Sequence, residues 1–462
     1  MDYASLPRWA QELIPIALLL LVVSVVVWRL PHVDLGHSAA YRRRRFLNWF
    51  PVGLTYAFLY MGRYNLTAFK NASGMSHDAY GTIDGAGALV YGCAFILNGP
   101  LTDRLGGKVT ILLAAVGAAV CNAAMGVLAL DGWREDDVTS FTLLYAANMY
   151  FQSFGAVSIV KLNAPWFHLR ERGTFGGIFG ILISLGLWFA YDWAPKITAG
   201  LDAPWAFFVP AIVLLVFAAI DALVVRNTPG EAGHRDFDTG DAGSQDQGPP
   251  LGLAVVARRM LTNPVILTIA GIELCSGFLR NAIMKWYQPF AKATGITDTF
   301  VPSNWGLLLC LAGILGGIFA GAISDHVFGS RRGPVASILY AGMVLGCVGV
   351  FALVTTPALG WVMVGMSLCV IGVHGMLSGT ASMDFGGKRN TGLVVGIIDG
   401  FVYLGTGLQA LTLKRILPDG AASADAANWR IWAVAMAPAA VLGLLLALRV
   451  WNARPATRTA GH

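Results

Sequence analysis

The segment GPLTDRLGGK at residues 99–108 follows a long apolar run and decides the fold, because the chain holds a second copy of its pattern. That copy, GAISDHVFGSRR at residues 321–332, also follows an apolar run. Both segments place an aspartate (Asp103, Asp325) four residues after a glycine, with basic or imidazole residues and a glycine turn behind it. A pattern that recurs 222 residues later (325 − 103) indicates a chain built from two similar halves.

Two arginines follow the same repeat. Arg63 lies in the apolar stretch YMGRYNLTAF, 40 residues before Asp103, and Arg280 lies in CSGFLRNAIMKWYQPF, 45 residues before Asp325. A charged side chain inside a membrane span costs at least about 2.5–3.5 kcal/mol by insertion scales, so such residues are functional by default. Because their places match, we expect the two arginines to lie at similar depth and to hold one anion between the halves.

The composition is typical of a multi-pass membrane protein. Of the 462 residues, 56% are hydrophobic and 13% are charged, and the mean hydropathy is +0.62. Soluble domains carry about a quarter charged residues. The net charge of +6 sits in loops and does not indicate a nucleic-acid partner. The six cysteines lie in apolar stretches without a CxxC pair, so we interpret them as small buried residues rather than disulfides or metal ligands.

Enzyme motifs are absent from the sequence. It contains no G-x-x-x-x-G-K-[ST] phosphate loop, no HExxH and no G-x-S-x-G. We therefore expect no enzyme activity, no metal and no cofactor, and we expect transport to draw its energy from gradients.

Apolar segments long enough to cross a hydrocarbon core of about 30 Å predict an all-α polytopic membrane protein with thirteen spans. They lie near residues 12–30, 46–69, 80–101, 108–130, 138–165, 173–197, 204–226, 264–290, 302–324, 334–355, 358–380, 390–413 and 428–450. The polar stretch 227–262 divides the last twelve spans six and six. We therefore expect an accessory helix and basic linker at 1–45, six-helix halves at 46–226 and 263–452, a cytoplasmic central loop at 227–262 and a cytoplasmic tail at 453–462.

Basic residues predict the orientation, because positively charged loops stay in the cytoplasm. One set of loops is rich in them: Arg42–Arg45, Arg104, Lys108, Arg170, Arg172, Arg258, Arg259, Arg331, Arg332, Lys388, Arg389, Arg454 and Arg458. The alternate loops hold few: Lys70, Arg134, Lys292, Lys414 and Arg415. We expect the C-terminus inside the cell and Met1 outside. The first apolar helix has a weak basic start and a poor cleavage site, so we interpret it as an accessory helix rather than a signal peptide.

These motifs resemble those of a known transporter family. The segment 99–108 and its second copy closely resemble the loop signature of the major facilitator superfamily. The stretches SDHVFGSRRGPVASILY (324–340), RERGTFGGIFG (170–180) and KRNTGLVVGIIDGFVYLGTGLQ (388–409) look like the organophosphate/phosphate antiporter family, which includes bacterial glycerol-3-phosphate and hexose-6-phosphate transporters. The resemblance covers roughly residues 46–450. It implies a major facilitator fold with two six-helix halves in a bacterial inner membrane, to which the span count adds one extra N-terminal helix.

The resemblance also implies where the substrate binds. The family's two phosphate-binding arginines match Arg63 and Arg280, its tyrosine in the eleventh core span matches Tyr403, and Asn65 fits its pattern. Three positions depart from the glycerol-3-phosphate members, which carry lysine, lysine and histidine where this chain has Tyr64, Phe95 and Ile183. We expect the phosphoryl site to be retained and the rest of the pocket to differ.

Two guanidinium groups suit a phosphate because each offers a planar fork of donors to the phosphate oxygens. The alternative is a structural ion pair, with Glu273 as the candidate partner of Arg280 and Asp84 as that of Arg63. Asp399, in the middle of its span, is a candidate for proton coupling or for orienting Tyr403.

Other polar side chains are weaker candidates. Besides Tyr64, they are Lys161, Asn281 and Trp286 for substrate contact. We place Lys285 near the end of its span, where long lysines reach toward water, and we interpret His374 as a buried hydrogen-bonded group.

The repeated loop motif predicts a gate rather than a substrate contact. Its residues are Gly99, Asp103, Arg104, Lys108, Asp325, Arg331 and Arg332. We expect each carboxylate to cap a helix end or pair with a basic loop residue, which latches the inward face until the halves rock.

The leading hypothesis is an exchanger of a phosphate ester for inorganic phosphate, embedded in lipid as a monomer. One alternative is a proton-coupled symporter of another organic anion, in which Asp399 or Glu273 titrates. The other is a membrane sensor that binds sugar phosphate and signals to a partner, as one branch of the family does.

Overall fold

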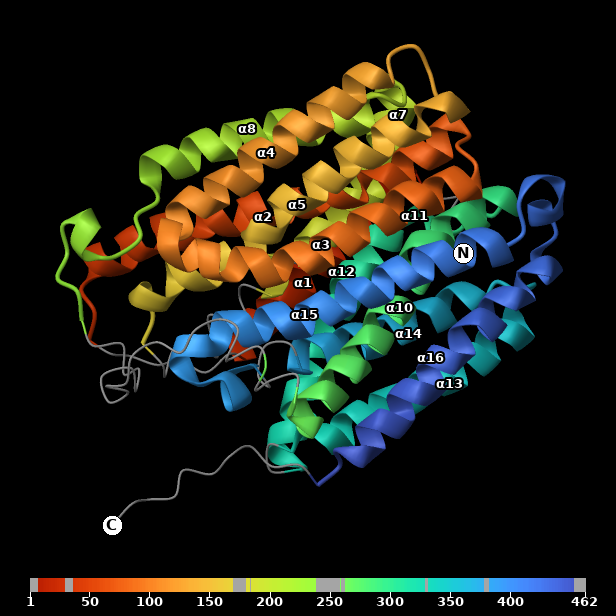
Figure 1. Cartoon of the computed structure of the whole chain (residues 1–462). Helices are drawn as coiled ribbons and strands as arrows, with labels where there is room; N and C mark the ends of the chain where they lie inside the picture. Colours follow the sequence, from red (N-terminus) through yellow and green to blue (C-terminus); the bar gives the residue numbers. More distant parts are fainter. Residues whose placement is uncertain are drawn as a thin grey trace.

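The computed structural model describes residues 7–29, 36–168, 180–182, 184–237, 258, 262–328, 331–377 and 382–452, and its ordered elements in these ranges are helices. Long helices form two groups that lie against each other (Figure 1). The all-α class expected from the sequence is confirmed.

The first helix group contains α2 (Ala39–Ser73), α3 (His77–Leu105), α4 (Gly107–Leu128), α5 (Val138–Asn163), the π-helix η5 (Phe189–Trp193) with α7 (Ala194–Leu201), and α8 (Trp205–Val224). The second helix group contains α10 (Pro264–Ala293), α11 (Phe300–Ser303), α12 (Trp305–His326), α13 (Arg332–Leu353), α14 (Leu359–Met376), α15 (Ser382–Ile416) and α16 (Arg430–Arg449). Short 3-10 turns lie at η2 (Glu135–Asp137), η3 (Ala164–Trp166), η6 (Gly230–Ala232), η9 (Gly420–Ala424) and η10 (Ala426–Trp429). The helix α1 (Arg8–Arg29) belongs to neither group.

Every expected span overlaps a helix. Among the described residues, eight helices are long and apolar enough to cross a membrane. Shorter apolar helical stretches lie at Ile16–Val26 and Trp305–Gly321. The total of thirteen spans remains a prediction.

Several features expected from the sequence lie outside the described residues. They are the motif residues 170–179, Ile183, most of the central loop and the C-terminal tail. The side chains of Asp103, Asp325, Lys388 and Arg389 lie outside the description as well.

A tight turn joins the two helices that begin the first group. The φ angle of Gly74 is 75°, a left-handed conformation that ends α2. Ser76 then caps α3, because its hydroxyl accepts a hydrogen bond from the Ala79 amide at 3.1 Å. The turn between α2 and the antiparallel α3 is therefore short.

Helices pack closely both between the two groups and within the second group. Helix α3 packs on α15, α2 on α10, and η5 on α12. Within the second group, a Cβ atom on Gly277 would collide with the backbone of Val402, and one on Gly405 would collide with Leu274. Only glycine permits this approach of α10 and α15, which brings Arg280 beside Tyr403.

The two ends of the bundle differ in charge and in contacts. We call one the basic end; it carries Arg42–Arg45, Arg104, Lys108, Arg226, Arg331 and Arg332. We call the other the opposite end; it carries Lys70, His77, Asp78, Lys292, Lys414 and Asp419. At the opposite end the groups are joined by polar contacts: Lys414 pairs with Asp78 at 3.0 Å, and the His77 amide donates to Asp419 at 3.0 Å. Lys292 also donates to the carbonyl of Asn71.

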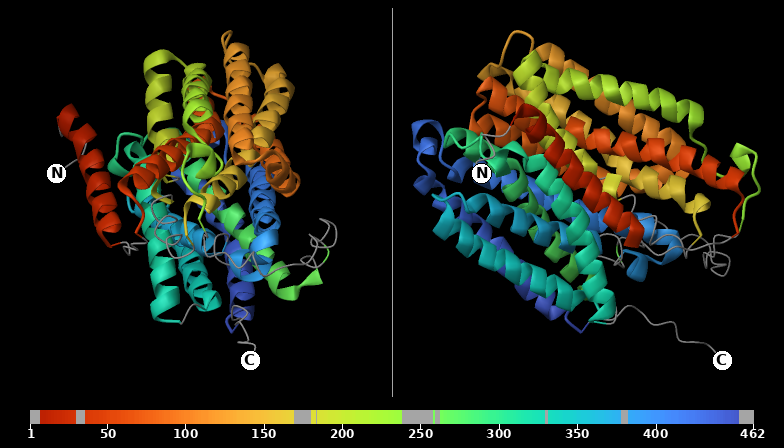
Figure 2. Two further views of the ribbon diagram at one scale, coloured as in Figure 1. Left: turned by 90° about the vertical axis from the view of Figure 1, so that its left-hand side faces the viewer. Right: turned by 180° about the vertical axis from the view of Figure 1, so that it is seen from behind.

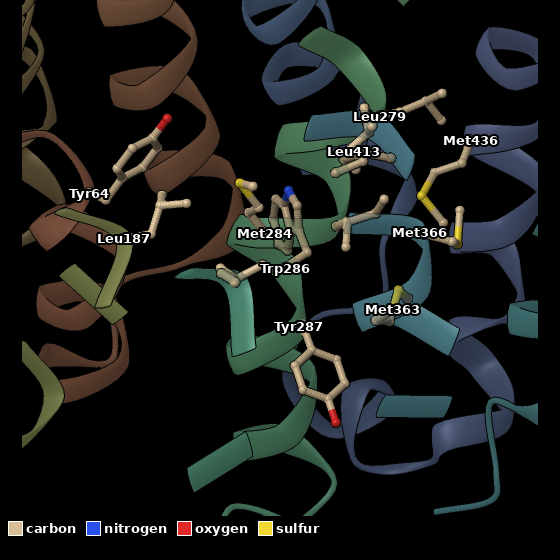
Figure 3. Packing of buried hydrophobic residues seen from close by; sticks show 14 of the residues in the cluster. Tyr64, Leu187, Leu279, Met284, Trp286, Tyr287, Met363, Met366, Leu413 and Met436 are labelled. Carbon is tan, nitrogen blue, oxygen red and sulfur yellow. The ribbon is translucent and has the colours of Figure 1, made fainter. Parts of the chain in front are cut away.

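The apolar core runs through both groups. Tyr64 and Leu187 of the first group belong to the same cluster as Met284 and Trp286 of the second, as Figure 3 shows. Helix α1 stands at the edge of the bundle (Figure 2) and packs through Leu19 on the apolar face of α12. The other face of α1 is apolar and exposed, which suits contact with lipid.

Candidate anion-binding site

Arg63 is buried in a preformed cradle. Its Nε donates to the Gln152 side-chain oxygen at 3.0 Å, and its two terminal nitrogens donate to the hydroxyls of Tyr403 and Tyr91, each at 2.8 Å. The guanidinium also lies 4.4 Å from the ring centroid of Tyr91 and 4.8 Å from that of Tyr60. All these partners are neutral, so they orient the positive charge without neutralising it.

Arg280 lies in the second group and has no such cradle. Its side chain is 6% exposed, and its Nε and one terminal nitrogen have no hydrogen-bond partner in the described part of the chain. Its guanidinium carbon lies 5.8 Å from the ring centroid of Tyr403, the same distance as that of Arg63. The two guanidinium carbons are therefore within twice that distance of each other. Two buried cations beside one aromatic ring form a site that an anion would stabilise.

The structural ion pairs considered for the arginines do not form. Glu273 contacts His374 instead, with 3.1 Å between a carboxylate oxygen and the imidazole Nδ1. Asp84 forms an ion pair with Lys285 and also accepts a hydrogen bond from the Tyr145 hydroxyl at 3.4 Å. Neither acid is a partner of either arginine, because both are engaged by other side chains.

Lys285 corrects the sequence-based expectation of a lysine that reaches toward water. It is 3% exposed, and its ammonium lies 5.3 Å from the ring centroid of Tyr64. Its partner Asp84 belongs to α3, so the ion pair links the two helix groups. Distance from a helix end did not predict this burial, because the interface between the groups covers the side chain.

Asn65 supports Arg63 indirectly. Its amide nitrogen donates to Asn122 at 2.7 Å and to the carbonyl of Ala206 at 2.9 Å. Asn122 donates to Asn148 at 3.1 Å, and Gln152 donates to the same Asn148 oxygen at 3.0 Å. A chain of side-chain amides thus runs from Asn65 to Gln152, the residue that holds the Nε of Arg63.

Sequence reasoning missed part of this cradle, although a signal was present. Tyr145, Asn148 and Gln152 recur with helical spacing on α5 and are all buried. Polar residues on one face of an apolar span indicate a lined site or a polar contact between helices. Tyr91 and Tyr60 carried no comparable signal, because aromatic residues are common in membrane helices.

Aromatic rings surround the two arginines. Tyr64 lies 5.7 Å from Tyr60, centroid to centroid, and Phe95 stacks on Tyr403 at 5.9 Å. Both positions depart from the family pattern. Tyr64 and Phe95 are both buried, and we call this pair of rings the aromatic wall.

Trp286 and Asn281 mainly contact other parts of the protein. Trp286 is 1% exposed and packs edge-on against His77 at 4.9 Å and Tyr80 at 5.6 Å, toward the opposite end. The Asn281 amide nitrogen donates to the Thr406 hydroxyl at 2.7 Å, which ties α10 to α15. The Asn281 oxygen remains unpartnered in the described part of the chain.

Lys161 and Asp399 differ in burial. Lys161 is exposed in the last turn of α5, nine residues beyond Gln152, which is roughly 14 Å along a helix. It is therefore not part of the Arg63 cradle. Asp399 is 9% exposed and precedes Tyr403 by one helical turn.

Three basic residues of the loop motif donate to neighbouring oxygen atoms at the basic end. Lys108 donates from its ammonium to the carbonyl of Ala222 at 2.7 Å, near the C-terminus of α8, where a cation is favoured. Arg332 donates to the Ser324 hydroxyl at 2.9 Å, and Arg331 to the carbonyl of Phe328 at 3.1 Å. Arg104 is exposed. Gly99 is buried within α3, and the latch expected of Asp103 and Asp325 stays a prediction.

Metal binding finds no support in the described ranges. They contain no group of three His, Cys, Asp or Glu residues able to hold a metal ion.

The fold and the sequence together define the class. The sequence pattern described as "Major Facilitator Superfamily" matches residues 52–410. The chain belongs to that superfamily and is a multi-pass integral membrane protein of the transporter class, not an enzyme. A bacterial homologue of the lysosomal transporter Spinster, in an inward-facing and unoccupied conformation, has a similar fold: the TM-score is 0.68 at 14% identity, covering 90% of this chain and 98% of that one. A D-xylose-proton symporter gives 0.60 at 15% identity, covering 87% and 97%.

Curated relatives narrow the class further. A glycerol-3-phosphate transporter of Bacillus subtilis is 25% identical over 91% of this chain and 96% of its own length. The membrane sensor protein UhpC of Salmonella typhimurium is 25% identical over 91% and 94%. A probable hexose phosphate transport protein of Chlamydia trachomatis is 23% identical over 89% and 91%. These relatives match the organophosphate:phosphate antiporter family that the motifs indicated.

Proposed function

We propose that this protein is a secondary active transporter that exchanges an organic phosphate ester for inorganic phosphate by alternating access. The observation that supports this most is the pair of buried arginines, one from each helix group, each 5.8 Å from the ring centroid of Tyr403. The relatives named as glycerol-3-phosphate and hexose phosphate transporters favour the same class of substrate.

The donor count suits a phosphoryl group. A guanidinium carries five N–H donors. Three of the Arg63 donors form hydrogen bonds to Gln152, Tyr91 and Tyr403, so two N–H donors remain for a ligand. Among the described residues, nothing accepts from the Nε–H or from one whole terminal NH2 group of Arg280. A phosphate with a charge of about −1.5 to −2 near pH 7 can accept from both arginines and balance both charges.

The same charges favour exchange over leak. When the groups close around an empty site, two desolvated cations approach each other, which is unfavourable. A bound anion removes that barrier, so the loaded carrier rocks and the empty carrier stays in place. Phosphate carried across in one direction therefore permits the ester to be carried back in the other.

The organic part of the substrate would contact the aromatic wall. Tyr64 and Phe95 stand where the glycerol-3-phosphate members carry lysines, so we propose that they set the preference among esters. Tyr403 and the amide chain from Asn65 would serve the phosphoryl end. Three further residues are weaker candidates for substrate contact. Asn281 lies next to Arg280 in the sequence, Lys161 lies further along α5 than Gln152, and Trp286 packs in the core.

We propose the following placement in the membrane. The basic end faces the cytoplasm of a bacterial cell, the protein lies in the inner membrane, and the two six-helix halves are 46–226 and 263–452. Met1 is outside and the C-terminus inside. Asp103 and Asp325 belong to gates at the basic end, acting with Arg104, Lys108, Arg331 and Arg332.

A sensor is the second candidate. The relative UhpC is as similar in identity and coverage as the transporter of Bacillus subtilis. A sensor of this fold would bind the ester without moving it.

Counterflow into phosphate-loaded vesicles tests the proposal. Purified protein is reconstituted with internal phosphate, and uptake of labelled glycerol-3-phosphate and hexose 6-phosphates is measured with and without a pH gradient. The exchanger requires internal phosphate and tolerates collapse of the proton gradient. Uptake that needs the gradient and ignores internal phosphate would establish a symporter. Binding without uptake would establish a sensor.

A further inference from the structure

Glu273 and His374 form a buried titratable pair that the anion site does not use. Glu273 is fully buried in α10, and one of its oxygens lies 3.1 Å from the Nδ1 of His374 in α14. Its other oxygen has no hydrogen-bond partner among the described residues. The His374 side chain is 23% exposed, so the pair has one member in the interior and one that reaches the surface.

Glu273 lies on the same helix face as Arg280 and nearer to the basic end. Glu273 precedes Arg280 by seven residues, which places both on one face of α10 about 10 Å apart. Ser276 lies between them on that face, and its hydroxyl is also unpartnered in the described chain. Because α10 starts at the basic end, Glu273 is nearer to that end than Arg280.

Few other charges lie near Glu273 among the side chains that the structure describes. Tyr340 of α13 donates its hydroxyl to the carbonyl of Ile272, and Cys275 lies on the same helix as Glu273. On α15 the nearest charged residue to the crossing with α10 is Asp399, one turn before Val402. The helix α16 carries its charges, Arg430 and Arg449, at its two ends.

We propose that Glu273 and His374 together bind one proton, and that this proton is taken up with the anion. This inference rests on the proposed function, because the anion is the one held by Arg63 and Arg280. A proton from water binds His374 Nε2, while Nδ1–H donates to the carboxylate of Glu273. The pair changes from a net charge of −1 to 0, and nothing else is made or broken.

The coupling is electrostatic. With a neutral imidazole, the carboxylate of Glu273 repels a phosphate beside Arg280. With an imidazolium, that repulsion is cancelled, so anion and proton each strengthen binding of the other. At a separation of about 10 Å and an intermediate dielectric constant, one charge changes the affinity for a dianion by tenfold or more.

Two substitutions give opposite predictions. Glu273→Gln removes the negative charge permanently, so phosphate should bind about tenfold more tightly than to wild type at pH 8 and equally at pH 5.5. His374→Gln can still hydrogen-bond to Glu273 but cannot take the proton, so phosphate should bind about tenfold more weakly than to wild type at pH 5.5 and equally at pH 8. A structural role would weaken binding in both variants at both pH values.

The experiment is titration calorimetry of the full-length protein in detergent with inorganic phosphate from pH 5.5 to 8, in two buffers of different ionisation enthalpy. The difference in proton uptake between wild type and each variant cancels the titration of phosphate itself. Asp221→Asn is the matched control, because Asp221 is a fully buried carboxylate hydrogen-bonded to Thr55 in the first group, and it should follow wild type.

The outcomes separate the two proposals. Opposite shifts, with proton uptake lost in both variants, support the proton site. Phosphate binding with one pH profile in wild type and all variants overturns the proton site and leaves the exchanger intact. A wild-type protein that binds no phosphate overturns the exchanger and the proton site with it.

Discussion

Arg63 and Arg280 occupy matching places in the two helix groups, but their surroundings differ. Arg63 is held by Gln152, Tyr91 and Tyr403, whereas two nitrogens of Arg280 have no partner in the part of the chain that the structure describes. The repeat therefore duplicates the position of the charge and not its cradle. The first group presents a cation held by three hydrogen bonds, and under the proposed function the second presents one whose two nitrogens without a described partner would bind the anion.

This asymmetry suits a carrier. An anion that met two fully satisfied arginines would gain little from the second one. An anion that met two unsatisfied arginines would have to order both. With one arginine preorganised and one unsatisfied, binding draws the second group toward the first.

The largest effect is expected from removing either charge. Arg280→Gln and Arg63→Gln should each weaken phosphate binding by about 2–5 kcal/mol. The two variants should differ in stability. Arg280→Gln removes a buried charge that no described acid neutralises, so the melting temperature should stay unchanged or rise. Arg63→Gln leaves Gln152, Tyr91 and Tyr403 without their hydrogen-bond donor, so the melting temperature should fall. Calorimetry and thermal melting of both variants check this. Equal losses of stability would show that the two environments are equivalent.

A smaller effect is expected from the cradle alone. Gln152→Leu removes the partner of the Arg63 Nε and interrupts the amide chain from Asn65. Phosphate affinity should fall by about 1–3 kcal/mol, because a buried donor is left unsatisfied. Leu444→Met on α16 serves as a control. Unchanged phosphate affinity in Gln152→Leu would mean that Arg63 does not depend on its orientation.

A still smaller effect on phosphate binding is expected from Tyr403, whose ring lies beside both arginines. Tyr403→Phe keeps the aromatic face beside Arg280 and removes only the acceptor for one Arg63 nitrogen. We expect a loss of about 1 kcal/mol, equal for phosphate and for esters, since both share the phosphoryl group. Binding of phosphate and of glycerol-3-phosphate to the same preparation measures it. A loss confined to the ester would place Tyr403 at the organic part instead.

The smallest effect on phosphate binding is expected from the two aromatic residues Tyr64 and Phe95. Tyr64→Leu and Phe95→Leu should change inorganic phosphate binding by less than about 1 kcal/mol, because neither side chain donates to the anion. They should change the ranking among esters in counterflow uptake. A ranking identical to that of wild type in both variants would remove these positions from the pocket.

The sequence predicted the shared features of the site better than its differences. The repeat predicted that the two arginines occupy matching places, and the hydropathy pattern predicted the all-α class, because charge and hydropathy are visible along the chain. Tyr403 was indicated by the family resemblance. The partners of Asp84, Glu273 and Lys285 were not predictable, since each ion pair joins helices far apart in sequence. The cradle of Arg63 likewise depends on which faces of α3, α5 and α15 meet, and that is decided by packing.

The central claim is that both arginines hold the phosphoryl group through planar forks of donors. The most direct test is binding of inorganic phosphate to wild type, Arg63→Lys and Arg280→Lys. Lysine keeps the charge but loses the fork, so each variant should lose about 2–5 kcal/mol of binding free energy. Normal phosphate binding by either lysine variant would show that this arginine is a structural charge, and would contradict the shared site.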